Sequence, residues 1–515
     1  MVYNVYVEGF MKKEVLKQII IQIKKYDLED AFSNIEEFNN WVSKLNSTQI
    51  SNFLSLDIDL EEIKEVRCLL IDNNLLNCKD YKQRVVAISK LKNGDGCWHL
   101  FKTICKPNFL NSNNFYKDIE VLSKADTARY GLWILGEDAF INSPYHDEDL
   151  KLLVETHDTD RENPLDFVVS DAIATVASNI DSIRSPYHRA DMKLIATVGS
   201  SCLQMSHTYP KGSLNNLAVN KVSLADKYHS ENMHILASKP IASEFLYIIM
   251  TDPNFVKGKN YRKEVEALVN AKSKTTARAL YYYIVNPKKK YFSDMDFLRD
   301  CKYDIKDAYI SGRNSVAGSN DSDYLKNLIR INEIDDELVM YFVSLLMNPN
   351  FINSSYKTFD LELLQSISSK PIFMDLYILM NEEVSLNNKY HKRDATIISQ
   401  AAIDDVRNLL LEKACNEYSL NSSSHESDME LISRLDLGSI SKEIYCELYY
   451  YLFNSDGIDD KNRNEKIKKL LSGEYVPRDT SVSSYLDDLQ SQLDSNNFGK
   501  KGMSRILSLF KRHSR

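Results

Sequence analysis

Two short strings recur along this chain, and their spacing constrains the fold more than any other feature. One is Pro-Asn-Phe, which begins at Pro107, Pro253 and Pro349. The other is a His followed three residues later by an Asp, as in His146/Asp149, His188/Asp191, His391/Asp394 and His425/Asp428. The interval from Asp360 to Asp394 and from Asp394 to Asp428 is 34 residues each, while that from Asp149 to Asp191 is 42. A series this regular indicates internal repeats.

Each repeat has the pattern of a helical hairpin. The His string follows Asn or Ser, whose side-chain oxygens can cap a helix, and an apolar stripe continues after it. A second helix then carries a Leu-aromatic core, as in Leu280-Tyr-Tyr-Tyr283. The Pro-Asn-Phe string is expected to close that helix, because Pro cannot continue the hydrogen-bond ladder. Phe109, Phe255 and Phe351 are then expected to fold back onto the helix pair.

A single hairpin cannot bury its apolar face, so neighbouring hairpins must stack to form a continuous core. The unit length and layout resemble those of tetratricopeptide- and HEAT-type α-solenoids, a resemblance that implies protein binding along a concave surface. We therefore predict an all-α, right-handed α-solenoid of about ten repeats of about 34 residues. Its parts are a helical N-terminal cap (1–80), the repeats (81–475), a polar linker or last helix (476–498) and a tail (499–515).

Helices are predicted within the cap at Phe10–Tyr26 and Asn34–Val42. Insertions near residues 156–165 and 199–223 lengthen two repeats, and loops of this kind often line the binding face of a solenoid.

Composition supports the helical class. Gly accounts for 15 and Pro for 11 of 515 residues, which leaves little material for the turns of many strands or for Gly-rich phosphate loops. A net charge of −9 weighs against a general nucleic-acid coat protein. The eight Cys form no C-x-x-C pair, and neither a signal peptide nor a run of about 20 apolar residues is present. A cytoplasmic protein is expected.

Several patterns could carry chemistry instead. A His and an Asp three residues apart share a helix face, and they could bind a metal or relay a proton. The same pair recurs in four places, whereas an active site is usually single, so repeat packing is the favoured interpretation. Weaker candidates are a calcium-type loop over 454–465, a thiol site at Cys202 and His207, and base stacking by Tyr281–Tyr283.

The tail is the most individual segment. Residues 499–515 hold six Lys or Arg and no acidic residue, so the rest of the chain carries −15. On a helix, Met503, Ile506, Leu507 and Phe510 would share one face. This tail could fray or cap the last repeat, dock onto a partner, or bind an anionic membrane or nucleic acid. The candidate binding residues are Lys500, Lys501, Arg505, Phe510, Lys511 and Arg512.

Together these features favour a non-enzymatic scaffold that binds a protein partner and uses no cofactor or metal. The alternatives are a peripheral membrane- or nucleic-acid-associated factor tethered by the tail, and an enzyme whose site lies in one diverged repeat.

Overall fold

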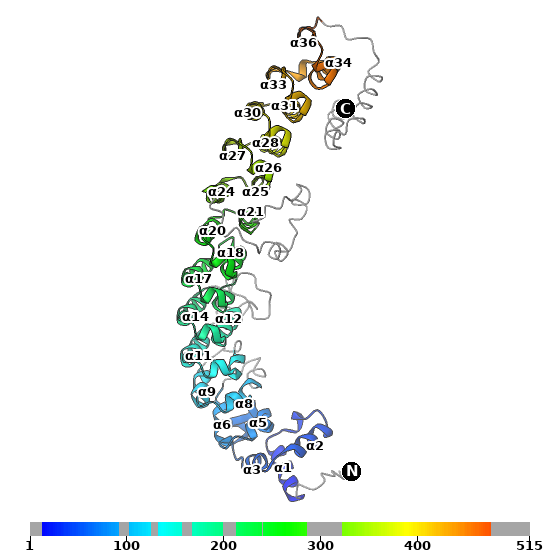
Figure 1. Cartoon of the computed structure of the whole chain (residues 1–515). Helices are drawn as coiled ribbons and strands as arrows, with labels where there is room; N and C mark the ends of the chain where they lie inside the picture. Colours follow the sequence, from blue (N-terminus) through cyan, green and yellow to red (C-terminus); the bar gives the residue numbers. More distant parts are fainter. Residues whose placement is uncertain are drawn as a thin grey trace. The chain divides into compact units, whose positions relative to one another are not determined.

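The computed structural model describes residues 13–91, 102–124, 132–156, 167–198, 213–238, 240–285 and 322–474. Throughout these segments the regular structure is helical and no strand occurs (Figure 1), which confirms the all-α class. The chain divides into two compact units. Met1–Pro287 and Lys306–Asn332 form the first unit, and Lys288–Ile305 and Glu333–Arg515 form the second.

The second unit shows the repeat in its simplest form, a first helix, a short helix of four residues and a last helix. The helices, in chain order, are α25 (Val339–Met347), α26 (Pro349–Ile352), α27 (Lys357–Ser366), α28 (Lys370–Asn381), α29 (Glu383–Leu386), α30 (His391–Gln400), α31 (Asp404–Cys415), α32 (Glu417–Leu420), α33 (His425–Ser433), η5 (Leu437–Ser439), α34 (Lys442–Phe453), α35 (Ser455–Ile458) and α36 (Arg463–Ser472).

The first unit begins with helices outside this pattern, which overlap the two helices predicted near the N-terminus. They are α1 (Lys13–Lys25), η1 (Glu29–Ala31), α2 (Ile35–Lys44), α3 (Ser47–Leu54) and α4 (Leu60–Ile63). Repeats follow, with η2 (Lys64–Ile71), α5 (Asn73–Leu76), α6 (Tyr81–Ile88), α8 (Pro107–Leu110), α9 (Phe115–Ser123), η3 (Leu132–Gly136), α10 (Asp138–Ile141), α11 (His146–Glu155), α12 (Phe167–Ala177), α13 (Ile180–Ile183), α14 (His188–Thr197), α15 (Leu214–Ala218), α16 (Lys221–Leu224), α17 (His229–Ala237), α18 (Ser243–Thr251), α19 (Pro253–Val256), α20 (Tyr261–Val269), α21 (Lys274–Val285) and α24 (Ser322–Glu333).

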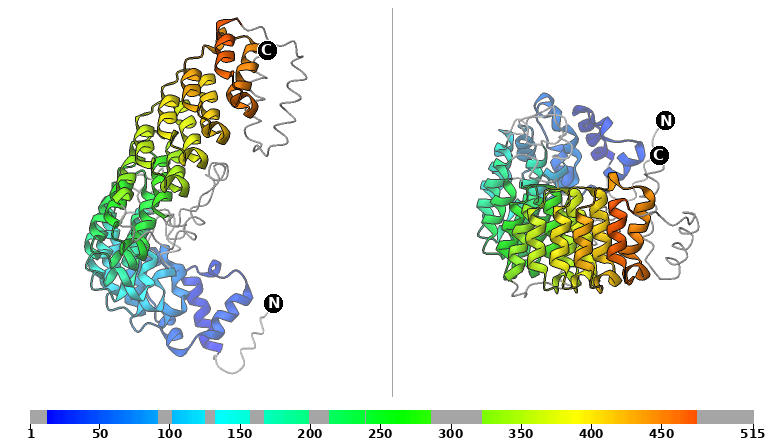
Figure 2. Two further views of the ribbon diagram at one scale, coloured as in Figure 1. Left: turned by 45° about the horizontal axis from the view of Figure 1, so that its top comes forward. Right: turned by 90° about the horizontal axis from the view of Figure 1, so that it is seen from above.

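Within each unit, equivalent helices of successive repeats contact one another in rows. First helices contact first helices, as in α12, α15, α18 and α21 of the first unit or α25, α28 and α31 of the second. Short helices form a second row, as in α13, α16 and α19, and last helices form a third, as in α14 with α17 or α30 with α33. The rows of the second unit are seen side by side in Figure 2, coloured yellow to red.

The short helix adds to the local interpretation of the Pro-Asn-Phe string. The preceding helix α25 ends at Met347, just before the string, as predicted, and Pro349 is also the first residue of α26, where its missing N–H and fixed φ are tolerated. Asn348 caps this helix by accepting a hydrogen bond from the N–H of Asn350 at 3.0 Å. Ten short helices of the two units begin eight residues before the last helix of their repeat. This short helix and turn form the constant part of each repeat, and length variation falls elsewhere.

The polar residue before the His string also has a different role from the predicted cap. Ser185 Oγ accepts a hydrogen bond from the N–H of Tyr187 at 3.1 Å, and Ser143 does the same for Tyr145. Both tyrosines occupy the N-cap position, where no side chain caps the helix. Ser therefore closes the turn that precedes the helix, the usual ST-turn role of a serine hydroxyl, and does not cap the helix itself.

Burial separates the three phenylalanines of the repeated string. Phe109 and Phe351 are fully buried, whereas Phe255 is only partly buried and no residue of α19 is buried. The aromatic side chain therefore anchors the short helix in two of the three repeats. The right-handed solenoid, the count of ten repeats and the boundaries at 80, 475 and 498 stay predictions.

We expect Phe351→Ala to destabilise its repeat by about 3–5 kcal/mol, the usual range for removing a fully buried Phe. Phe255→Ala is the matched control, and its effect should be less than half as large because its ring is partly exposed. Hydrogen exchange in α26 and α19 measures each effect locally, without assuming that the chain unfolds in one step. Equal losses of protection at the two sites would contradict this account of the short helix.

Candidate functional site

The His and Asp of the repeated string do not bond to each other. The Nε2 atom of each His contacts the carboxylate at the fourth position of the previous last helix, at 2.8–3.0 Å. In the first unit the pairs are His146–Asp118, His188–Asp149 and His229–Asp191, and in the second they are His391–Asp360 and His425–Asp394. Every side chain in these pairs is at most 5% exposed. We call this series the His–Asp ladder and each His–Asp pair a rung.

A serine supports the other face of most of these rings. The Ser lies six residues before the His, in the short helix of the same repeat, and its Oγ is 2.8–3.1 Å from Nδ1. The pairs are Ser182–His188, Ser223–His229, Ser385–His391 and Ser419–His425. A carboxylate can only accept, so a neutral ring donates from Nε2 to Asp while Nδ1 accepts from the hydroxyl. Both ring nitrogens of each of these four His are thereby hydrogen-bonded, as burial requires.

This Ser–His–Asp chain has the residues of a hydrolytic triad but not its geometry. In that triad the Ser approaches Nε2 and the Asp holds Nδ1, and the Ser must meet the substrate. Here the two nitrogens have the opposite partners, and Ser182, Ser223, Ser385 and Ser419 are fully buried. The observed contacts connect neighbouring helices and leave no room for a substrate at these hydroxyls.

A tyrosine covers each later His from the preceding repeat. The residue before each ladder helix stacks on the His of the next repeat, with centroid distances of 4.7–4.9 Å. The pairs are Tyr145–His188, Tyr187–His229, Tyr356–His391 and Tyr390–His425. The His of each of these repeats thus contacts two groups of the preceding repeat, a carboxylate and an aromatic ring.

At three junctions of the first unit, both partners differ from His and Asp. Arg84 lies over the ring of Phe115 at 4.2 Å, Asn232 donates to the hydroxyl of Tyr261 at 2.8 Å, and Tyr324 donates to Glu264 at 2.8 Å. Arg84, Asn232 and Glu264 occupy the position of the Asp, and Phe115 and Tyr261 occupy that of the His, while Tyr324 is the third residue of α24. Each replacement keeps a complementary contact, a cation on a ring or a matched hydrogen bond.

At the last carboxylate of the ladder in the second unit, two cations take the place of the His. Asp428 contacts Arg463 at 2.6 Å and Lys413 at 2.9 Å, and all three side chains are at most 5% exposed. Burial lowers the pKa of Lys413, while Asp428 opposes that effect. The carboxylate is thus paired although no His follows it.

His146 is the one His of the ladder without a Ser on Nδ1. That nitrogen lies 3.1 Å from the carbonyl oxygen of Phe140, which can only accept, so it needs a proton to form the bond. Burial opposes the charged ring, but the hydrogen bond to Asp118 and the Phe140 carbonyl together raise the pKa of His146. Burial also raises the pKa of Asp118, against the opposing effect of His146. In this pair the pKa values of both partners are therefore raised.

The other candidates from the sequence either form no site within the described residues or lie outside them. No group of three or more His, Cys, Asp or Glu side chains that could hold a metal occurs in the described part of the chain. The segment compared with a calcium loop contains the short helix α35, capped by Asn454, and Tyr281 and Tyr283 are buried in the core. Cys202, His207 and the tail residues Lys500, Lys501, Arg505, Phe510, Lys511 and Arg512 lie outside the described residues.

The sequence interpretation did not identify which residue of the neighbouring repeat each His or Asp bonds to. It found the His and Asp three residues apart, but not that they bond to different neighbours. The supporting Ser left a readable signal, since it stands six residues before the His in four repeats. Asp118 and Asp360 resembled degenerate copies of the string because Phe115 and Lys357 replace the His in their own helices.

Comparisons with protein-family models, with curated proteins and with solved structures return no match to this chain. Among the described helices, none has the length and apolar character needed to cross a membrane.

Removing one partner of a rung should strongly destabilise the unit that contains it. We expect Asp191→Ala to lower the free energy of unfolding of the first unit by about 3–5 kcal/mol, because His229 would keep a buried donor without an acceptor. Asp191→Asn keeps an acceptor and should cost less. In a double-mutant cycle with His229→Ala, the two losses should be strongly non-additive. Glu148→Ala, which breaks only the exposed contact with Arg189, is the control and should cost at most about 1 kcal/mol. A loss for Asp191→Ala no greater than this would refute the ladder's role.

The His146 rung should make stability depend on pH. Because its folded pKa is raised, its contribution is complete below the unfolded value of about 6.5 and disappears as pH rises through the folded value. The raised pKa of Asp118 acts in the same direction, in a lower window that begins near pH 4. The difference in unfolding free energy between the native chain and His146→Gln should therefore shrink as pH rises above about 6.5. A difference that stays constant as pH rises would argue against the raised pKa of His146.

Proposed function

We propose that this chain is a non-enzymatic scaffold that binds another protein on a right-handed α-solenoid of about ten repeats. The observation that carries the proposal is the ladder, because one buried contact type recurs at successive repeat junctions in both units. Catalysis needs one specialised cluster, whereas a stack of repeats needs the same junction many times. The resemblance to tetratricopeptide- and HEAT-type solenoids points to the same class of function.

The distribution of sequence variation among the repeats supports a binding role. In most last helices, positions one, four, five and eight are buried, as His188, Asp191, Met192 and Ile195 are in α14. Positions two, three and six are largely exposed, and they differ freely from repeat to repeat. A constant buried face with a variable outer face allows each repeat to present different chemistry on one framework.

The predicted partner surface is the concave face with the loops near 156–165 and 199–223. Of these loops, residue 156 and residues 213–223 lie in the described part of the chain, where Ser213 and Leu214 are buried and Lys221 is exposed. Residues 157–165 and 199–212 lie outside it. The cytoplasmic location and the partner on the concave face are part of this proposal.

A solenoid should tolerate loss of one whole repeat. Deleting residues 360–393 removes 34 positions and joins the start of α27 to Asp394, so the His425–Asp394 rung is kept in register. We expect a folded protein whose longest dimension by small-angle X-ray scattering is shorter by about 10 Å, one interhelical spacing.

The control is a deletion of residues 360–376, half a repeat, which brings α27 against the middle of α28 and should unfold the second unit. If the whole-repeat deletion unfolds as fully as the half-repeat deletion, the solenoid arrangement is wrong.

The tail supports a second candidate, a peripheral factor tethered to an anionic membrane or to nucleic acid. Its support is the six cations of residues 499–515 in a chain of net charge −9. Deleting these residues separates the two proposals. A tethered factor loses binding to anionic vesicles or nucleic acid, while a scaffold keeps its cross-links to a partner protein, mapped by mass spectrometry on the exposed positions of the last helices.

A further inference from the structure

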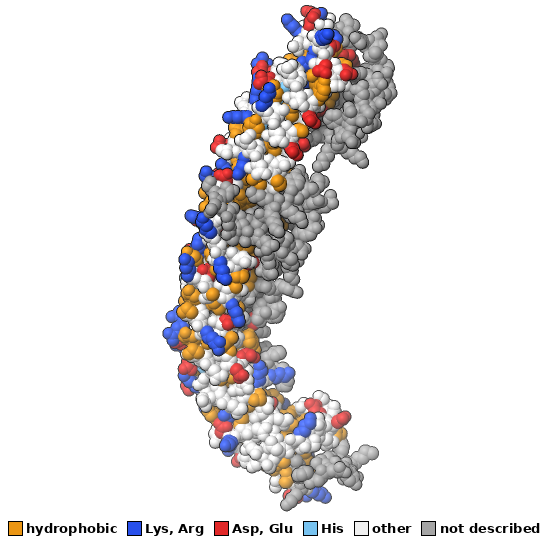
Figure 3. Space-filling model, viewed as in Figure 1, with side chains coloured by type: hydrophobic (Ala, Val, Ile, Leu, Met, Phe, Trp, Pro, Cys, Tyr) orange, Lys and Arg blue, Asp and Glu red, His pale blue; other side chains and the backbone are white. Residues whose placement is uncertain are grey.

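Three successive repeats of the first unit place cations along one edge. The edge is formed by the turns between short and last helices, residues 184–189, 226–231 and 257–263, and we call it the basic edge. Its cations are Arg184, Arg189, Lys227, Lys257, Lys259, Arg262 and Lys263. Six are exposed and Arg262 is partly buried. Figure 3 shows Lys and Arg side chains over the row of α14, α17 and α20.

Contacts place the three segments next to one another. The short helices α13, α16 and α19 contact in sequence, and the rings of Tyr187 and His229 lie 4.7 Å apart. Tyr228 and Tyr261 continue this series at 6.4 Å. With interhelical spacings of 8–10 Å, the edge is about 20 Å long. It is therefore a strip of positive charge and not a single pocket.

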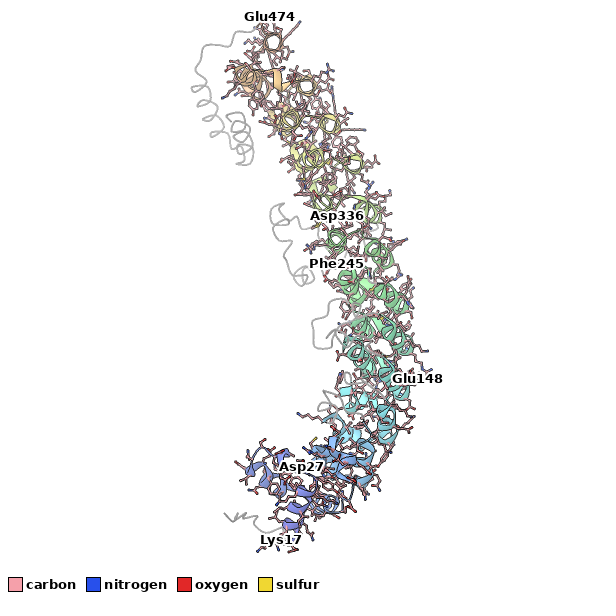
Figure 4. All side chains as sticks on the ribbon, turned by 180° about the vertical axis from the view of Figure 1, so that it is seen from behind. Lys17, Asp27, Glu148, Phe245, Asp336 and Glu474 are labelled. Carbon is pink, nitrogen blue, oxygen red and sulfur yellow. The ribbon has the colours of Figure 1, made fainter. Side chains whose placement is uncertain are left out.

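Acids compensate part of this strip, and Lys263 pairs with Glu266 at 2.9 Å within α20. Asp226 is buried and accepts hydrogen bonds from the N–H of Tyr228 and from Asn232. Glu231 pairs with Arg262, and Arg189 pairs with Glu148 of the preceding repeat, at 2.7 Å. Figure 4 labels Glu148, which points away from the stack. Within the described residues, Arg184 and Lys257 form no ion pair, and Lys227 contacts the ring of Tyr228 but no acidic side chain.

These charges do not serve helix stability. Arg189, Arg262 and Lys263 lie in the first turn of α14 and α20, where the helix dipole disfavours a cation. At the same positions α11 carries Asp147 and Glu148, which the dipole favours. Arg189 and Arg262 offset this cost through ion pairs with acids of the preceding repeats, whereas Lys263 gains only an exposed pair with Glu266.

The surroundings of the cations favour a uniformly charged polymer. None of the large apolar side chains that are exposed in the described residues belongs to the three segments, so the edge lacks the apolar anchor of a protein interface or a membrane-inserting surface. Lys227 and Arg262 lie over the ring of Tyr228, at 4.8 Å and 4.6 Å. Because cations already contact this ring, we favour contacts with the phosphates over base stacking.

We propose that the basic edge binds the phosphodiester backbone of a nucleic acid without reading its sequence. This activity is separate from protein scaffolding, because it uses the turns of three repeats in the first unit. It also does not depend on the tail. Binding should show the strong salt dependence of counterion release.

The test uses the full-length chain and fluorescence anisotropy with labelled 20-nucleotide RNA, DNA of the same length and a 20-base-pair duplex. The triple variant Arg184→Glu, Lys227→Glu, Lys257→Glu should weaken binding at least 10-fold at 50 mM salt. The matched control, Lys442→Glu, Lys461→Glu, Lys468→Glu, changes three exposed lysines of the second unit by the same charge and should change binding less than 3-fold. Circular dichroism checks that both variants are folded.

A second measurement separates phosphate contacts from a general charge effect. For the neutral variant Arg184→Gln, Lys227→Gln, Lys257→Gln, the slope of log affinity against log salt on single strands should fall by about 2, since each lost contact removes about 0.7.

Three outcomes overturn the proposal. They are absence of binding at 50 mM salt and micromolar protein, equal losses in the edge variant and its control, and a loss confined to vesicles containing phosphatidylserine or to a poly-glutamate peptide. The last outcome would assign the edge to a membrane or to an acidic protein. None of these results touches the scaffold proposal, which the repeat deletion tests.

Discussion

The buried bond between an imidazole of one repeat and a carboxylate of the repeat before it is the contact on which the rest of the structure depends. Burying an isolated carboxylate is prohibitively costly, so the Asp in each last helix requires a partner. The repeat's own His cannot serve, because it bonds to the Asp before it. The contact therefore has a direction along the chain, and each repeat is complete only when its neighbour is in register. Apolar stacking alone would allow sliding, whereas the hydrogen-bonded pair fixes one position.

A directional series of this kind needs both a beginning and an end. In the first unit, Phe115 takes the place of the first His and accepts the guanidinium of Arg84 on its ring. In the second unit, Asp428 would lack a His, and Arg463 with Lys413 supplies the missing charge. Between these limits the partners change in pairs, as in Asn232 with Tyr261 and Glu264 with Tyr324. The physical requirement at each junction is thus complementarity within a buried pair, and His with Asp is one solution among several.

The sequence predicted the all-α class and the two N-terminal helices, because these follow from local periodicity and from the shortage of Gly and Pro. It also located the His and Asp of most rungs, but it paired them within one helix, since residues three apart share a face and sequence alone shows no neighbour. Partners 28–39 residues apart depend on how repeats stack. The capping role assigned to Ser185 was wrong because the hydroxyl closes the preceding turn, and the different burial of Phe255 and Phe351 depends on tertiary packing around identical strings.

The net charge of −9 describes the outer surface poorly, and the ladder explains why. Its carboxylates, such as Asp149, Asp191 and Asp394, are buried and hydrogen-bonded, so they add to the formal count without being available to contact a ligand at the surface. Asp226 and Glu264 are buried in the same way, in the repeats that carry the basic edge. A stretch whose formal charge is nearly balanced by such acids therefore presents mainly its cations to solvent. For a repeat protein with a polar core, charge must be counted residue by residue on the exposed positions before a partner is excluded.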